Sequence, residues 1–345
     1  MIRICSTLAN AGYQVHIVGR KLNNSIALVP RPYTQKRLWC LFEKGPLFYF
    51  TYNLQLFFYL LVKPMDALCA VDLDTILPVL FVSKLKGKKR IYDAHELFCE
   101  MKEIVTRPRI YTIWKAIEKF AVPQFRLGYT VNEPIANEFK KMYNINYTVI
   151  RNIARLNTLH LQKENYILYQ GAVNEGRSFE TLIPAMQHVY GVLIICGDGN
   201  YMQQTKALVE KYQLQSKVIF KGMCAPDLLA AITAKAYIGI TLFERSGLSN
   251  YYSLANRFFD YIQHAVPQLC VNYPVYAAIN NEIEVAVLID DLSATSIANA
   301  LNNMIADKAN WQRLHDNCIK AAAIYNWENE EKKLVHFYKQ IPWAN

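Results

Sequence analysis

The chain has 345 residues, which is too long for one ordinary hydrophobic core and predicts two domains. Hydrophobic residues make up 52% and charged residues 19%, which is typical of a soluble globular protein and excludes a disordered or fibrous one. The eight cysteines include no C-x-x-C pair, so we expect no zinc site and no disulfide framework, but reduced thiols in a cytoplasmic protein.

The net charge of +10 is distributed unevenly along the chain. Residues 1–160 hold 23 Lys and Arg against 11 Asp and Glu, whereas residues 161–345 hold 15 against 17. The excess is most visible in the clusters at 84–90 and 107–109. Such asymmetry indicates an anionic partner: a membrane surface, a nucleic acid or a phosphorylated acceptor. A solvated basic face without a partner is the alternative.

The first residues do not open as a Rossmann-type half normally does. Residues 2–11 have helical spacing, Gly12 ends the helix, and residues 13–18 are a predicted strand. A strand and a tight loop should come before that first helix. We therefore expect an N-terminal sheet without its first strand, from a start assigned at an internal Met or from a true truncation.

An apolar run, LFYFTYNLQLFFYLLV, follows Pro46 and ends at Val62. A membrane span needs about 20 such residues, so this shorter run, with Thr51, Asn53 and Gln55 inside it, predicts a buried helix. Its aromatic content and flanking cations leave attachment to a membrane surface as the alternative. No signal peptide is visible.

Asp72 and Asp74 end a predicted strand and spell D-x-D. Two carboxylates at this spacing can bridge a divalent cation to a pyrophosphate. Three-residue patterns are frequent by chance, however, and Asp74 is well placed to cap the helix predicted at 75–85. We favour the capping role and expect no metal.

The next predicted strand, RIYDAHELF, carries Asp93, His95 and Glu96 to its C-terminal end. Open α/β sheets bind ligands at that end of their strands. A lone histidine is more often structural, but this position beside two carboxylates favours a functional site. Strand and helix signals then alternate to residue 152, and residues 153–165 are a predicted linker.

The second half repeats the strand–helix alternation more regularly. Residues 166–169 form a predicted strand, followed by a glycine-bearing loop and Ser178 as the expected N-cap of a helix. After the strand at 191–196, the turn Gly197-Asp198-Gly199 gives a weak dinucleotide signal. Lys221 stands where an NAD site needs a carboxylate, so NAD is disfavoured.

The stretch LFERSGLSNYYSLANRFFDYIQHAVP, residues 242–267, predicts a strand end, a polar loop and a helix starting at about Ser253. A helix N-terminus at the edge of a parallel sheet binds phosphate. Here Ser253, Asn256, Arg257 and Asp260 supply a hydroxyl, an amide, a cation and a carboxylate. Together they could hold a phosphate and a ribose.

This stretch resembles the donor-site segment of family 4 glycosyltransferases, S-L-P-N-K-L-F-E-Y-x-x-x-G-x-P, which stands here as SLANRFFDY and AVP. Ala255, Asp260 and Ala265 replace its proline, glutamate and glycine, and Tyr252 takes the place of a second glutamate. The D-x-H-E segment and the Phe220-Lys221-Gly222 segment resemble the same family. In the glycine-bearing loop the family often has two cations; one is Ala172 here, leaving Arg177, with Arg257 as a substitute.

The resemblance implies the GT-B fold, with two Rossmann-like domains facing a cleft. It assigns residues 1–155 to an N-terminal acceptor domain and residues 156–325 to a C-terminal donor domain. Residues 326–345 would form a helix that crosses back to the N-terminal domain. It implies a retaining, metal-independent glycosyltransferase with no cofactor besides its nucleotide-sugar donor, acting on a glycan or lipid-linked acceptor in polysaccharide biosynthesis. The protein would be cytoplasmic, with attachment to an anionic inner membrane surface.

Applied residue by residue, the resemblance makes His95 and Arg177 catalytic. The expected donor-binding residues are Gly171, Arg177, Gly197, Asp198, Gly199, Gly222, Met223, Ser253, Asn256, Arg257 and Asp260. A non-catalytic GT-B-like binding protein is the main alternative, suggested by Tyr252 and Ala172. A nucleic-acid-binding protein is disfavoured because no recognition helix, zinc spacing or RNP-like motif accompanies the charge.

Overall fold

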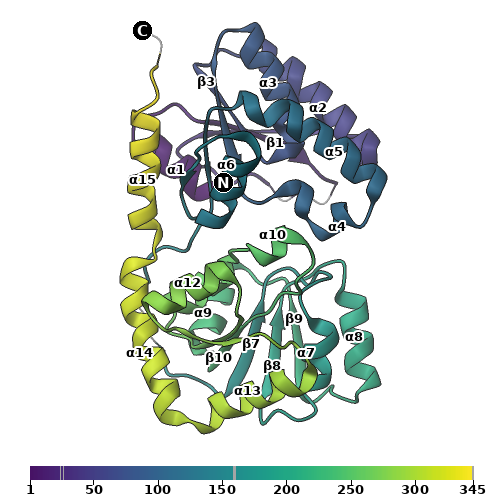
Figure 1. Ribbon diagram of the computed structural model, residues 1–345, viewed down its shortest axis with the longest axis vertical. Helices are drawn as coiled ribbons and strands as arrows, with labels where there is room; N and C mark the ends of the chain where they lie inside the picture. The colour runs from purple at the N-terminus through teal and green to yellow at the C-terminus, as the bar shows by residue number, and fades with distance from the viewer. Residues whose placement is uncertain (24, 26, 158–160, 344–345) are drawn as a thin grey trace. The chain divides into compact units, whose positions relative to one another are not determined.

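The structure is a computed structural model that describes residues 1–345 except residues 24, 26, 158–160 and 344–345. The chain divides into two compact units, residues 1–151 with 330–345, and residues 152–329 (Figure 1). The boundaries expected from the sequence, at 155/156 and 325/326, lie within four residues of these. Part of the predicted linker, residues 158–160, lies outside the described residues.

The second unit is built on a six-stranded parallel sheet in the order β12-β11-β10-β7-β8-β9. Its strands are β7 (Tyr166–Gln170), β8 (Val192–Cys196), β9 (Val218–Gly222), β10 (Ile238–Thr241), β11 (Gln268–Val271) and β12 (Ala286–Ile289). The chain runs outward from β7 to β9, then returns to the other side of β7 with β10. The order therefore reverses between β7 and β10.

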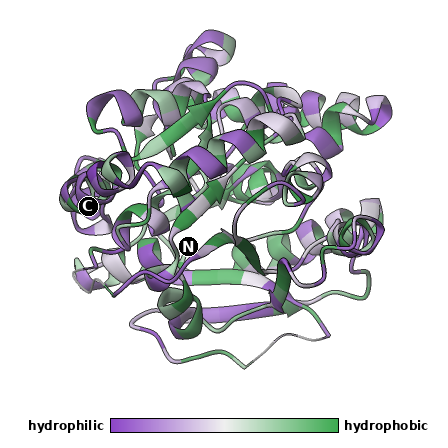
Figure 2. Cartoon of the chain, turned by 90° about the horizontal axis from the view of Figure 1, so that it is seen from below, coloured by the Kyte–Doolittle hydropathy of each residue, from purple (hydrophilic) through white to green (hydrophobic). Residues whose placement is uncertain are grey.

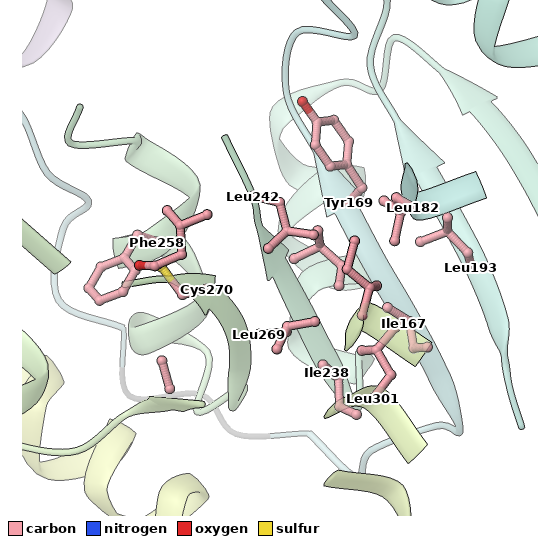
Figure 3. Packing of buried hydrophobic residues seen from close by; sticks show 14 of the residues in the cluster. Ile167, Tyr169, Leu182, Leu193, Ile238, Leu242, Phe258, Leu269, Cys270 and Leu301 are labelled. Atoms are coloured by element: carbon pink, nitrogen blue, oxygen red, sulfur yellow. The ribbon is translucent and has the colours of Figure 1, made fainter. Parts of the chain in front are cut away.

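Helices cover this sheet because its central strands are mainly apolar. Every residue of β7, β10 and β11 is buried, as expected of parallel strands with both faces covered. Ile167, Ile238 and Leu269 pack with Leu301 in the resulting core (Figure 3). The helices of this unit are α7 (Phe179–Ala185), α8 (Met202–Lys211), α9 (Pro226–Lys235), α10 (Gly247–Tyr251), α11 (Asn256–Gln263), α12 (Pro274–Glu282), α13 (Ala294–Ala306) and α14 (Lys308–Ile324).

The described strands of the first unit form two separate sheets. One is the parallel pair β1 (His16–Lys21) and β2 (Thr34–Trp39). The other is four-stranded and parallel, in the order β3 (Ala67–Val71), β4 (Lys89–Ala94), β5 (Leu127–Thr130) and β6 (Thr148–Val149). Within the part of the chain that the structure describes, β1 and β3 each pair along one edge.

The helices of the first unit are α1 (Ile2–Asn10), α2 (Gly45–Val62), α3 (Ile76–Leu85), α4 (Lys102–Val105), α5 (Pro108–Ala121), α6 (Glu133–Tyr143) and, from Glu330 onward, α15 (Trp327–Lys339). Most helices alternate hydrophilic and hydrophobic residues, because each buries one face (Figure 2). The Thr7 hydroxyl donates to the Glu331 carboxylate at 2.8 Å, and the Tyr129 ring contacts the Phe337 ring. The C-terminal helix thus completes the first unit's core.

Three local expectations are corrected. A short helix, α10, replaces the polar loop expected after β10. The helix expected from Ser253 begins at Asn256, because the Tyr276 hydroxyl accepts from the Ala255 N–H at 3.0 Å and contacts the Ser253 hydroxyl at 3.2 Å, holding these residues outside it. Ser178 precedes α7 but does not cap it, since its backbone is left-handed (φ 58°).

The apolar run forms helix α2, but only one face of it is buried, through Phe48, Tyr52 and Leu56. The expectation of a buried helix is therefore right for that face and wrong for the opposite one. Among the described residues, no helix has the length and apolar character needed to cross a membrane.

Candidate functional site

The candidate donor residues gather at the carboxyl ends of the second unit's strands. The turns after β7, β8 and β9 and the start of α11 all lie at this edge. The reversal of strand order between β7 and β10 falls there too. Open parallel sheets bind ligands at such a reversal, because the flanking turns diverge and leave room.

Two glycine turns interlock at this edge. The Gly171 N–H donates to the Cys196 carbonyl at 2.9 Å, and the Gly197 N–H to the Gly222 carbonyl at 2.8 Å. A Cβ on Gly197 would stand 1.8 Å from the Gly171 carbonyl oxygen, and the φ of Gly197 is +146°. Only glycine fits there, so backbone rather than side chains forms this wall of the site.

Arg257 lies in the first turn of α11 and is 8% exposed. Its guanidinium carbon is 4.7 Å from the centre of the Tyr169 ring and 4.6 Å from that of Phe243, and its Nη1 donates to the Tyr169 hydroxyl at 3.4 Å. Its Nε and Nη2 have no hydrogen-bond partner among the described residues. A buried cation with unmet donors is costly unless an anion completes it.

Arg177 reaches the same aromatic ring from the turn after β7. Its guanidinium carbon lies 4.4 Å from the centre of Phe243, and its Nη1 donates to the Asn250 side-chain oxygen at 3.3 Å. Arg177 and Arg257, which are 80 positions apart in the sequence, therefore meet around Phe243. This brings together the two elements on which the predicted donor site depends.

Asp260 follows Arg257 by one turn of α11. Its Oδ2 accepts from the Gln170 side chain at 2.9 Å, and Gln170 in turn accepts from the Thr233 hydroxyl at 2.6 Å. Gln170 is the last residue of β7, so this chain of hydrogen bonds fixes the carboxylate beside the glycine turns.

The remaining predicted donor-binding residues differ in their contacts and exposure. The Asp198 carboxylate accepts from the Gly199 N–H at 2.8 Å and so stabilises its own turn. Met223 is 78% exposed just beyond Gly222. Asn256 is exposed at the first position of α11.

Sequence reasoning missed Tyr169, Phe243 and Gln170. Each stands at or just beyond the carboxyl end of a strand, on the same edge as the arginines. Aromatic or amide side chains at strand ends, next to predicted cations, are the signal that would have found them.

His95 belongs to the first unit and lies directly after β4. Its Nε2 is 3.0 Å from the Asp93 carboxylate, its Nδ1 is 3.8 Å from that of Asp72, and its backbone N–H donates to Asp72 at 2.8 Å. Burial lowers the pKa of His95, but the hydrogen bond and charge of Asp93, with the charge of Asp72, raise it to about 9. Burial likewise raises the pKa of Asp72 to about 7, against the lowering effect of His95. The two carboxylates therefore favour the protonated imidazole.

The D-x-D pair does not act as expected. Asp72 binds the His95 backbone, and the N-cap position of α3 is Thr75 rather than Asp74, without a side-chain cap. Burial raises the pKa of the Asp74 carboxyl, and the backbone N–H groups of Asp74 and Thr75 together with the charge of Arg20 oppose this rise. In the described part of the chain, no group of three or more His, Cys, Asp or Glu is arranged to hold a metal ion.

The fold and this edge of the sheet define a two-unit α/β protein of the GT-B class, and comparison with known proteins agrees. The model of the family described as glycosyl transferases group 1 matches residues 151–324, and the chain belongs to this family. A probable sucrose-phosphate synthase 2 from Oryza sativa subsp. japonica is 25% identical over 134 residues, which cover 37% of this chain and 13% of that protein. The chain thus aligns with only a small part of that relative.

Solved structures share the fold at low sequence identity. Sucrose-phosphate synthase from Thermosynechococcus elongatus has a TM-score of 0.78 at 18% identity, covering 98% of this chain and 92% of its own. WaaG, a glycosyltransferase involved in lipopolysaccharide biosynthesis, has a TM-score of 0.77 at 15% identity, covering 98% and 94%. Anabaena Alr3699/HepE, in complex with UDP and glucose, has a TM-score of 0.71 at 11% identity, covering 90% and 87%.

These findings confirm the predicted family, the GT-B fold class and the assignment to the glycosyltransferases.

Proposed function

We propose that the chain transfers a sugar, with retention at the anomeric carbon and without a metal ion, from a nucleotide-diphosphate sugar to a glycan or lipid-linked acceptor. The observation that carries the donor site is the buried Arg257, whose Nε and Nη2 lack partners among the described residues. A diphosphate beside the glycine turns would supply the missing negative charge.

The proposed mechanism meets the charge of the leaving diphosphate with fixed groups. Arg257, Arg177 and the N-terminus of α11 stand at the edge where that charge develops, and preorganised donors stabilise it at no reorganisation cost. Asp260, oriented by Gln170, would accept hydrogen bonds from the ribose hydroxyls. Backbone groups near Gly222 and the exposed Met223 would face the base.

His95 is proposed to contact the transferred sugar, an assignment supported by the family resemblance. The His95 Nε2 lies 3.0 Å from the Asp93 carboxylate, and the two neighbouring carboxylates raise the pKa of His95 to about 9, which favours the protonated ring at neutral pH. It would therefore act as a hydrogen-bond donor to a sugar hydroxyl rather than as a general base. The carboxylates of Asp93 and Asp72 supply the negative charge around it.

We propose that the protein binds its acceptor at a membrane surface. The excess of positive charge lies in residues 1–160 and favours an anionic surface, with the protein cytoplasmic and peripheral on the inner face. WaaG, named for lipopolysaccharide biosynthesis, supports an acceptor of the glycan or lipid-linked class and a place in polysaccharide biosynthesis.

The donor can be identified by thermal shift with UDP-, GDP-, ADP- and CMP-linked sugars, because a bound ligand raises the melting temperature. UDP is the first probe, since the Anabaena HepE structures contain it. Transfer in the presence of a chelator tests metal independence, and NMR of the product tests retention. Arg177→Ala should reduce transfer and UDP affinity together; unchanged transfer in that variant would remove Arg177 from the site.

A further inference from the structure

Helix α2 is apolar on the face that it turns outward. The exposed fractions are 56% for Leu47, 66% for Phe50, 45% for Leu54, 57% for Phe58 and 76% for Val62. These residues recur at intervals of three or four and so form one continuous stripe. A helix that is apolar on all sides is normally covered on all sides, but here one side is bare.

The stripe is not a consequence of a loosely attached helix. On the inner side, the Asn53 amide donates to the Asp74 carbonyl at 3.0 Å, and the Tyr49 ring contacts the Trp114 ring. The Lys86 ammonium donates to the carbonyls of Leu61 and Lys63 at the end of α2, at 3.0 and 2.5 Å. The helix is therefore fixed at its middle and its end, with the stripe held outward.

The neighbouring helices α3 and α5 also expose apolar side chains. Helix α3 packs between α2 and α5, which lie side by side with it in Figure 1. Phe81 and Leu85 of α3 are exposed, as are Ile113 and Phe120 of α5. The surface formed by these residues and the α2 stripe is called the apolar face below.

Charge distinguishes among the partners that could cover the apolar face. Helices α2, α3 and α5, whose residues are all described, contain one acidic residue, Glu118, which is buried and 2.6 Å from the Lys115 ammonium. Exposed cations lie in or next to these helices: Lys44, Lys63, Lys84, Arg107, Arg109 and Lys119. The exposed acidic residues beside α2 are Glu43 and Asp66, and the Asp66 carboxylate lies 3.5 Å from the Lys88 ammonium. Apolar residues framed mainly by cations complement an anionic lipid surface, whereas a second copy would bring like charges together.

We propose that the apolar face is a membrane-docking surface, and that Phe50 and Phe58 of α2 insert shallowly among the acyl chains of an anionic bilayer. This inference rests on the proposed function in one respect: it names the surface through which the proposed peripheral attachment to the membrane would occur. Because α2 lies along the surface by its side, the docking needs no membrane-spanning segment.

Vesicle sedimentation of the full chain tests the surface. Wild-type protein should bind vesicles of phosphatidylcholine with about one third phosphatidylglycerol, and bind pure phosphatidylcholine far less. The double variant Phe50→Ser/Phe58→Ser should lose about tenfold or more of this binding. The matched control is Tyr190→Ser/Leu228→Ser, which removes two exposed large side chains from the second unit and should bind as wild type does.

A second measurement covers the case in which the serine variant misfolds. Phe58→Trp keeps the surface apolar, and brominated lipids should quench its added fluorescence in anionic vesicles. Absence of wild-type binding, equal binding by the serine variant, or absence of quenching would each overturn the proposal. So would sedimentation velocity showing a wild-type dimer that the serine variant abolishes, because a second copy would then cover the face.

UDP calorimetry without vesicles separates this proposal from the proposed function. Intact UDP binding with no vesicle binding rejects the docking surface and leaves the donor site standing. Vesicle binding without UDP binding supports the docking surface and rejects the donor site.

Discussion

The two units each hold a cationic side chain at the carboxyl edge of a parallel sheet, half-buried His95 in the first and buried Arg257 in the second, but they balance its charge differently. In the first unit, His95 stands between the carboxylates of Asp93 and Asp72. In the second, Arg257 packs against two aromatic rings and leaves two of its nitrogens without hydrogen-bond partners among the described residues. The His95 site has its counter-charges within the protein, although His95 Nε2 and Asp93 Oδ2 also lack hydrogen-bond partners among the described residues. The Arg257 guanidinium instead contacts aromatic rings and the Tyr169 hydroxyl, and we propose that a ligand supplies its counter-charge.

This difference separates stability from function. A cation paired inside the protein contributes to folding and makes the fold sensitive to pH. A buried cation without a counter-ion costs folding free energy, and this cost is recovered when an anion binds. Substitutions in the two sites should therefore move different measurements.

The largest expected effect comes from Gly197→Ala, which tests whether the donor edge depends on backbone contact. The new Cβ would stand 1.8 Å from the Gly171 carbonyl oxygen, at a strained φ. We expect a loss of about 3 kcal/mol or more of unfolding free energy, measured in urea.

Gly222→Ala is the matched control for this loss. It adds a Cβ at a φ of +64° with no atom within 4 Å, so backbone strain alone should cost about 1–2 kcal/mol. Equal losses in the two variants would mean that contact between the turns is unimportant.

Next in size is Arg257→Met, which tests the incomplete site directly. Removing the buried cation should weaken UDP binding about 100-fold in calorimetry. The ligand-free protein should be no less stable in a thermal melt, because a methionine needs no anion. Arg245→Met, an exposed arginine over the Tyr251 ring, is the control and should change neither. A clear fall in the melting temperature of the ligand-free variant would contradict this, because it would show that Arg257 stabilises the fold without a bound anion.

Asp260→Asn should have a smaller effect on the same edge. An amide oxygen still accepts from Gln170, so folding should be unchanged, but hydrogen bonds to the ribose should weaken. We expect about tenfold weaker UDP binding by calorimetry. The loss should shrink with 2′-deoxy-UDP; an equal loss with both nucleotides would show that Asp260 does not contact that hydroxyl.

The smallest expected effect is the pH dependence of the first unit. The folded pKa of His95, about 9, is above its ordinary value of 6.5, so the stability from its protonation is full below pH 6.5 and is lost as pH rises through 9. Asp93 and Asp72 raise this pKa, while burial and the α-amino group of Met1 oppose them.

The melting temperature should accordingly fall by a few degrees between pH 6.5 and 9, and less so in His95→Asn. His188→Asn, at an exposed position of the second unit, is the control. A His95→Asn variant with the wild-type pH dependence would contradict the cluster's role.

Much of the donor edge could be predicted from the sequence, because its signals are local. A buried strand, a glycine turn and a helix carrying Arg257 and Asp260 are adjacent in the chain, and parallel topology brings successive strand ends to one edge. The sheet of the second unit was predictable for the same reason.

The aromatic support of the arginines was not predictable in this way. Tyr169 and Phe243 approach Arg257 through the pairing of β7 with β10, and Gln170 meets Asp260 across 90 positions. Helix α10 has five residues, too few to produce a periodic pattern. The left-handed backbone of Ser178 has no signal in its residue type, because serine seldom adopts that conformation.

The contact between Gly171 and Gly197 also limits how this protein can diversify. A side chain at Gly197 would collide with the Gly171 carbonyl, and one at Gly171 would require a strained φ of +116°, so single substitutions at either glycine are disfavoured. Met223 lies on an open rim of the same edge and has no such constraint. New donor preferences are therefore expected to arise from changes around Met223, while the paired glycines stay the same.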